Sequence, residues 1–138
     1  MIKRLKAGTK WISCITVLSS GDHVLVGGYD KRVNWFDLDL KTDPFKSMKY
    51  YSRAIRSVYI HPQYPLIATG SDDGAVHVFQ ARVFSDLMRN PFIVPVKNLN
   101  AHYVHGDVGV FDLEFHPTQP WLFSCGGDKN IHLFQNIP

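Results

Sequence analysis

The sequence predicts an all-β protein built from about three blades of a β-propeller, chiefly because it contains an internal repeat. Residues 53–80 align without gaps on residues 108–135 at seven identical positions, where roughly two are expected from average residue usage. Residues 10–37 fit the same frame as a third copy. Repeats of this kind, built of short strands and turns, are typical of propeller blades. The identical pairs are His61/His116, Pro62/Pro117, Pro65/Pro120, Asp73/Asp128, His77/His132, Phe79/Phe134 and Gln80/Gln135.

The spacing of the copies predicts the blade boundaries. Asp30, Asp73 and Asp128 occupy the same position in the three copies and lie 43 and 55 residues apart. A four-stranded blade takes about 40 to 45 residues, so the second copy contains an insertion. We therefore expect an outer strand of a preceding blade at 1–9, blades at 10–52 and 53–100, and a closing blade without its own outer strand at 101–138.

Each copy predicts the same series of strands. An alternating apolar run ends at a His-Pro pair in the second and third copies, because proline cannot donate to a strand ladder. A short apolar strand, a Gly/Asp turn and a third strand follow, since these turn residues accept positive φ or bond their own backbone. Outer fourth strands are expected at 45–52 and 94–99.

The insertion at 81–91 predicts a short amphipathic helix on the rim of the second blade. Val83, Phe84, Leu87 and Met88 share one face of this helix, and an Asn-Pro pair ends it. Two interpretations remain open, a helix that covers its own blade and a helix that docks a partner.

Three blades are too few to close a propeller, which has about 4 to 8 of them. Two apolar blade faces are then left uncovered, and such faces bind partners. We expect the chain to be part of a longer protein or to self-associate through its open blade faces.

Composition predicts a soluble intracellular domain. The chain has a net charge of +3 and two cysteines, too few for a disulfide framework. It has neither an apolar run long enough for a membrane span nor a signal-peptide core. Residues 1–56 carry 11 Lys and Arg against 5 acids, whereas residues 57–138 carry 4 against 7. The basic half indicates either a nucleic-acid or acidic partner, or simply a solvated surface.

The sequence does not indicate an enzyme, a cofactor or a metal site. It contains no nucleotide-binding glycine motif, and its histidines recur at equivalent positions, which favours a structural role. His102 and His105 lack companion ligands at zinc spacing. We therefore predict a non-catalytic protein without cofactor or metal.

A buried polar network is expected in the third copy. His102 precedes the first strand, where WD repeats carry a histidine, and Ser124 and Asp128 occupy the matching strand and turn positions. Hydrogen bonds among the three would satisfy polar groups that are costly to bury. Thr69 and Asp73 form a lesser version in the second copy, and Asp30 is the counterpart of Asp73 in the first.

One surface is the candidate partner or RNA site, and we call it the loop face. It is formed by the turns and the loops between blades, and it is rich in Arg and Tyr, which suit protein hot spots as well as phosphate and base contacts. A charged, solvated rim is the equal alternative. The loop face comprises Tyr29, Lys31, Arg32, Tyr50, Tyr51, Arg53, Arg56, Tyr103, His105 and Lys129.

The whole chain resembles the C-terminal WD-repeat region of the block-of-proliferation ribosome biogenesis protein family. The resemblance rests on long strings in a fixed order. They are KWIS (10–13), GGYDKRVNWFDLDL (27–40), HPQYPLIATGSDDG (61–74), RVFSDLMRNPFIVPVK (82–97) and HPTQPWLF (116–123).

This resemblance implies a seven-bladed WD40 propeller in a protein of the nucleus and nucleolus that matures ribosomal RNA of the large (60S) subunit. It also implies three partners: a WD-repeat protein with a ubiquitin-like domain, pre-ribosomal RNA, and a pescadillo-type protein bound through a region absent from this chain. We expect no membrane association, since no apolar run is long enough to span a bilayer. The alternatives are a generic WD-repeat adaptor for peptide motifs and a stand-alone RNA-binding module.

Overall fold

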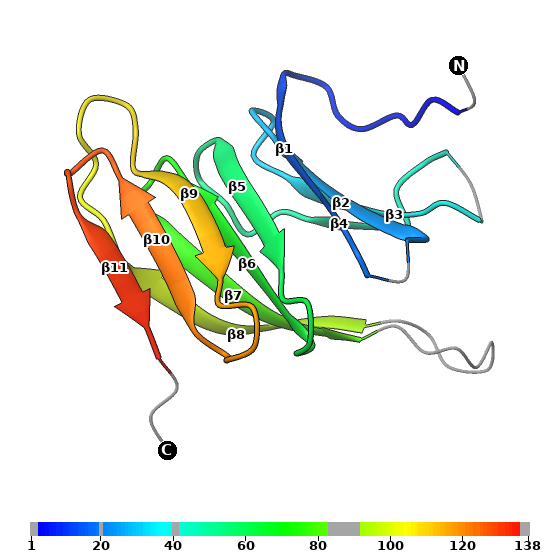
Figure 1. The fold of residues 1–138 in the computed structure, drawn as a ribbon. Helices are drawn as coiled ribbons and strands as arrows, with labels where there is room; N and C mark the ends of the chain where they lie inside the picture. Colours follow the sequence, from blue (N-terminus) through cyan, green and yellow to red (C-terminus); the bar gives the residue numbers. More distant parts are fainter. Residues whose placement is uncertain (1–2, 20, 40–41, 83–91, 136–138) are drawn as a thin grey trace.

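Three antiparallel sheets make up the computed structural model, which describes residues 3–19, 21–39, 42–82 and 92–135 (Figure 1). Blade 1 contains β1 (Ile12–Val17), β2 (His23–Gly28), β3 (Val33–Asp37) and β4 (Lys46–Met48). Blade 2 contains β5 (Ile55–Ile60), β6 (Leu66–Ser71), β7 (Ala75–Arg82) and β8 (Phe92–Asn100). Blade 3 contains β9 (Val110–Phe115), β10 (Leu122–Gly126) and β11 (Ile131–Phe134).

Within each sheet, strands that follow one another in the chain are hydrogen-bonded neighbours. The prediction of an all-β propeller segment is confirmed by this arrangement. Among the described residues no helix is both long and apolar enough to traverse a membrane.

Two tight turns shape each blade. At the His-Pro turn of blade 2, Nδ1 of His61 accepts hydrogen bonds from the backbone N–H groups of Gln63 and Tyr64, both at 3.0 Å. At the turn between the second and third strands, Lys31, Gly74 and Lys129 adopt left-handed conformations with φ of 64°, 82° and 69°. Glycine takes this conformation without cost, whereas a side chain is disfavoured there.

The blades pack face to face through two apolar cores. The first lies between blades 1 and 2 and buries Trp35 completely against residues such as Ile55 and Phe79. The second lies between blades 2 and 3 and contains Val76 and Val110. The innermost strands β1, β5 and β9 adjoin their neighbours in turn.

Two boundary predictions differ from the structure. The first outer strand covers only Lys46–Met48, because the chain then turns inward and buries Tyr51. The predicted helix at 81–91 is wrong at its start, since Ala81 and Arg82 continue β7 and pair with Ile93 and Phe92 of β8. The remaining positions, 83–91, lie outside the described residues.

The N-terminal segment also departs from its predicted strand form. Residues 3–9 contain no strand, since no earlier sheet edge lies beside them among the described residues. Leu5 and Ala7 nevertheless pack on the outer face of blade 1, against Val24, Val26 and Phe36.

Candidate functional site

The predicted polar network of blade 3 is present in the structure. The His102 side chain is fully buried. Its Nδ1 lies 2.9 Å from Oδ1 of Asp128, and its Nε2 lies 2.8 Å from Oγ of Ser124. Because a carboxylate only accepts, Nδ1–H of His102 donates to Asp128, and this bond holds the pKa of Asp128 well below its ordinary value.

The network also fixes the loops of blade 3. Asp128 accepts further bonds from the backbone N–H groups of Asn130, at 3.1 Å, and Tyr103, at 3.2 Å. The side chain therefore ties the tight turn to the loop that enters the blade. Gly126 makes room for this arrangement, because a Cβ there would lie 2.5 Å from Nδ1 of His102.

The same cluster has the composition of a metal site. Ligand atoms of His102, Asp128 and His132 lie within 4.8 Å of one another. Both ring nitrogens of His102 are already hydrogen-bonded, and the ring of His132 packs edge-on against it with centroids 4.5 Å apart. Hydrogen bonding and ring packing therefore account for the cluster, and the absence of a metal remains a prediction.

Blade 2 contains a different version of this network. The hydroxyl of Tyr51 lies 2.8 Å from Oγ1 of Thr69, and both groups are buried. Asp73 accepts bonds from Ser71, from Ser52 at 3.1 Å, and from the backbone of Ala75 at 3.0 Å. Burial alone would raise the pKa of Asp73, but these hydrogen bonds outweigh it and lower the pKa.

Tyr51 therefore does not belong to the loop face. The sequence placed it on the binding surface, whereas the structure buries it to 7% exposure in the core between blades 1 and 2. Its phenol takes the place that His102 has in blade 3. In blade 1, the corresponding Asp30 has a weaker partner, the N–H of Thr9 at 3.4 Å.

The side chain of Arg56 is engaged in contacts within the protein. Its Nε donates to both carboxylate oxygens of Asp72, at 2.9 and 3.0 Å. Its guanidinium carbon lies 5.0 Å from the ring centroid of Tyr29, a distance suited to a cation–π contact. The contact with Tyr29 connects blade 2 to blade 1, whereas the pair with Asp72 lies within blade 2. Both Tyr29 and Arg56 are only partly exposed.

The other seven loop-face residues are exposed. They lie in loops that are joined by backbone hydrogen bonds within each blade, such as those of Tyr29 to Trp11 and Asp72 to Ala54. The exposed members are Lys31, Arg32, Tyr50, Arg53, Tyr103, His105 and Lys129.

Trp11 is a candidate that sequence reasoning missed. It is 77% exposed, and its ring lies 5.6 Å from that of Tyr29 between centroids. Together with Thr9 and Lys10 these rings line a shallow hollow beside the loop face. The available signal was an aromatic residue next to a lysine just ahead of the first strand.

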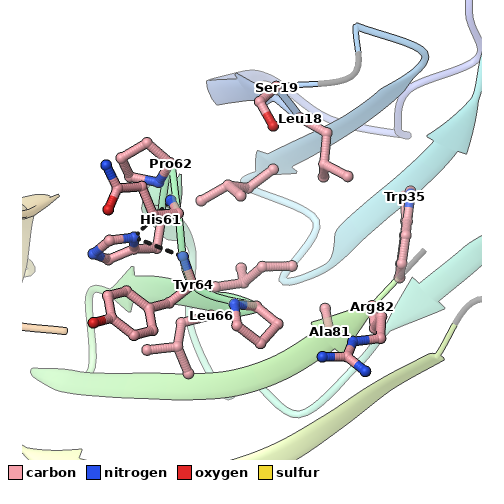
Figure 2. Close-up of a pocket in the computed structure, with 13 residues that line it drawn as sticks. Leu18, Ser19, Trp35, His61, Pro62, Tyr64, Leu66, Ala81 and Arg82 are labelled. Atoms are coloured by element: carbon pink, nitrogen blue, oxygen red, sulfur yellow. Dashed lines mark hydrogen bonds between the residues drawn. The ribbon is translucent and has the colours of Figure 1, made fainter. Parts of the chain in front are cut away.

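A cavity of about 290 Å³ lies between blades 1 and 2, near the His-Pro turn (Figure 2). Leu18, Trp35, Tyr64 and Arg82 are among its lining residues. His61 points its Nε2 to the carbonyl of Gln119 in blade 3, at 2.7 Å, so both of its ring nitrogens have partners. No hydrogen bond pairs a nucleophile with a base among the described residues that line the cavity.

Comparison with known proteins identifies close relatives. Residues 1–37, 43–80 and 93–135 match the family described as "WD domain, G-beta repeat". Over 134 residues, 97% of the chain, it is 51% identical to ribosome biogenesis protein bop1 of Danio rerio and 51% identical to ribosome biogenesis protein erb1 of Schizosaccharomyces pombe. It is 48% identical to ribosome biogenesis protein BOP1 of Homo sapiens over the same length. The resemblance drawn from the sequence is confirmed.

The chain corresponds to a small part of these relatives. It spans 17% of the Danio rerio protein and 18% of the other two. A chain in the crystal structure of a mitotic checkpoint complex superposes with a TM-score of 0.78 and 20% identity, over 99% of this chain and 39% of that one. At that identity the likeness concerns the fold alone.

Proposed function

We propose a binding role without catalysis, because this chain belongs to the WD domain, G-beta repeat family. Within that role we propose that it forms part of a docking scaffold for assembly of the large ribosomal subunit, in the nucleus and nucleolus. The observation that carries this proposal is an identity of 48% to 51%, along 97% of the chain, to proteins named for ribosome biogenesis.

The loop face is the surface we assign to docking. Two carboxylates next to the loop face are engaged internally, since Asp72 binds Arg56 and Asp128 binds His102. Lys31, Arg32 and Arg53, in contrast, are exposed. An exposed cationic surface attracts phosphate groups, because binding releases counterions from the nucleic acid.

Aromatic rings add a second contribution on the same side of the protein. Tyr103 is 84% exposed and Trp11 is 77% exposed. Bases of single-stranded RNA stack on such rings, and each stacked base contributes about 1–3 kcal/mol. Cations beside exposed rings support pre-ribosomal RNA as one partner of this surface.

Protein partners belong to the same proposal. We propose that a WD-repeat protein with a ubiquitin-like domain docks on the propeller. A pescadillo-type protein would act through a region outside this chain. Both expectations come from the family resemblance, and no single residue of this chain is assigned to either partner.

Salt-dependent RNA binding tests the loop face. We would measure fluorescence anisotropy of a labelled single-stranded RNA across a series of KCl concentrations. A variant with Lys31, Arg32 and Arg53 changed to alanine should lose affinity and about 2 units of the log–log salt slope, since each phosphate contact to a single strand contributes about 0.7.

A matched control removes the same charge elsewhere. Changing the exposed Lys46, Arg82 and Lys97, which lie on β4, β7 and β8, should leave the slope nearly unchanged. Equal losses in the two triple variants would exclude the loop face as the RNA site. Arg56 is left intact because its loss would also break its contact with Asp72.

Affinity capture from nuclear extract tests the ribosomal role separately. Recovery of pre-ribosomal factors is expected. Recovery of signalling or ubiquitin-ligase components without such factors would instead favour a generic adaptor for peptide motifs.

A further inference from the structure

The two junctions between neighbouring blades differ at the end that carries the His-Pro turns. At the junction of blades 2 and 3, His61 spans the gap: its Nε2 lies 2.7 Å from the carbonyl oxygen of Gln119, and its ring packs on Phe115 with centroids 5.0 Å apart. Leu18 is the counterpart of His61 in blade 1, since both residues donate the backbone bond that closes the turn after the innermost strand. A leucine side chain has no polar atom, so Leu18 cannot form this bond to blade 2.

The junction of blades 1 and 2 contains the cavity of about 290 Å³, which we call the junction cavity. Leu18 and the buried Trp35 line it from blade 1, and Ile60, Pro65 and Ala81 line it from blade 2 (Figure 2). Its wall is therefore largely apolar. The volume lies at the lower limit of the about 300–1,000 Å³ that is typical of small-molecule sites, so the junction cavity fits one large side chain.

The His-Pro turn of blade 2 gives this cavity a fixed rim. Nδ1 of His61 accepts hydrogen bonds from the N–H groups of Gln63 and Tyr64, both at 3.0 Å. The ring of Tyr64 stands edge-on against the imidazole, with centroids 4.8 Å apart. A rim that is already ordered lowers the entropic cost of binding a ligand.

A cation stands at the margin of the junction cavity. Arg82 is the only charged side chain among the described residues that line it, and it is exposed. Within the described part of the chain no ion pair involves Arg82, whereas Arg56 is paired with Asp72. A guanidinium group binds a carboxylate through two parallel hydrogen bonds. The junction cavity therefore favours a ligand that combines a large apolar side chain with a negative charge.

We infer that the junction cavity docks an acidic peptide segment of another protein. A leucine or aromatic side chain of the peptide enters the cavity, and a neighbouring Asp or Glu pairs with Arg82. A nucleic acid suits the site less, because it would bring several phosphates to one cation and an apolar wall. β5 starts beside the loop face and ends at His61, so the junction cavity lies at the opposite end of the blades. The inference is thus independent of RNA binding at the loop face.

Selection from a random dodecapeptide display library is the first test, with the chain as bait. Enriched peptides should carry Asp or Glu beside a leucine or an aromatic residue. Failure to enrich any peptide, or enrichment of basic peptides, would overturn the inference. The most enriched peptide, labelled with fluorescein, then serves as the probe for fluorescence anisotropy.

Leu18→His tests the cavity itself, because it gives blade 1 the residue that spans the other junction. The imidazole should reach the carbonyl of Tyr64, the counterpart of Gln119, and fill the cavity. Peptide affinity should fall about 10- to 100-fold, as expected when a large apolar side chain loses its buried position. If circular dichroism reports a lost sheet signal, Ser19→Trp at an exposed lining position narrows the mouth instead. Unchanged affinity in a folded variant would contradict the inference.

Reversal of charge tests the role of Arg82. Arg82→Glu should weaken binding about 10-fold, since a charge-assisted pair is lost, and a peptide with Lys in place of its acidic residue should regain affinity for this variant. Lys97→Glu is the matched control, because Lys97 on β8 is exposed and does not line the junction cavity. An equal loss in the two variants would overturn the inference, as it would indicate general attraction to a basic protein.

Competition separates this site from the loop face. The variant with Lys31, Arg32 and Arg53 changed to alanine should bind the peptide like the unmodified chain, and an excess of single-stranded RNA should leave the peptide bound. Displacement of the peptide by RNA from the unmodified chain would overturn the inference, because it would mean that the two ligands share one surface.

Discussion

The bond between Tyr51 and Thr69 allows a sharp test of the core, because both partners are buried and each can be removed without changing the shape of the site. Tyr51→Phe leaves Oγ1 of Thr69, a residue at 0% exposure, without its partner at 2.8 Å. An unsatisfied buried polar group costs about 1–3 kcal/mol. Thr69→Val should cost about the same, because it leaves the phenol unpaired.

The double variant distinguishes the hydrogen bond from packing. Removing both polar groups leaves nothing unsatisfied, so the double variant should lose less free energy of unfolding than the sum of the single losses. Urea denaturation followed by circular dichroism measures each value, and with a slope of about 2 kcal/mol per M each single change should lower the midpoint by about 0.5–1.5 M. Additive losses would show that the two side chains do not interact.

The same pair predicts a dependence on alkaline pH. Burial raises the pKa of Tyr51 above its ordinary value, since it disfavours the phenolate. A group whose pKa is raised by folding contributes its stability below the unfolded pKa, about 10 for tyrosine, and loses it as pH rises above that value. The unmodified chain should therefore lose more stability above about pH 10 than Tyr51→Phe does. Equal pH profiles would refute this account of the phenol.

Three further predictions concern other contacts. Asp128→Asn should lower the urea midpoint at neutral pH and reduce the loss of stability in acid, because the bond from His102 lowers the pKa of Asp128. The benefit is fully present above the unfolded pKa of about 3.9 and is lost as pH falls from there through the lower folded pKa; parallel acid titrations by circular dichroism would decide it. Lys129→Gly should raise thermal stability by about 0.5–1 kcal/mol, since Lys129 has a φ of 69° that disfavours a side chain, and a lower melting temperature would contradict it. His61→Phe should lower the melting temperature by removing the bond to Gln119, and unchanged calorimetric unfolding would exclude that role.

Most of the fold could be predicted from the sequence because the internal repeat shows the same pattern in each blade. Strand order, the His-Pro turns and the His102, Ser124 and Asp128 network follow from short patterns whose geometry is set locally and repeated in each blade. The burial of Tyr51 could not be predicted, because it lies in a loop where no strand alternation assigns a side chain to the core. The two-oxygen contact of Arg56 with Asp72 was also missed, since nothing in the spacing of the two residues distinguishes an internal ion pair from a free surface charge.

Because of the arrangement of the two cores, the three blades should differ in how well their amide protons are protected from exchange with solvent. Across the residues that the structure describes, the blades share no strand ladder, so each sheet is held to its neighbour by side-chain packing and isolated bonds such as that of His61 to Gln119. In stacked repeats of this kind, stability is a sum of unit and nearest-neighbour contributions. Blade 2 has a neighbour on both sides, so its amide protons should exchange with deuterated solvent most slowly. The amide protons of the first and third sheets should exchange earlier, so the middle of the chain should be the last part to open.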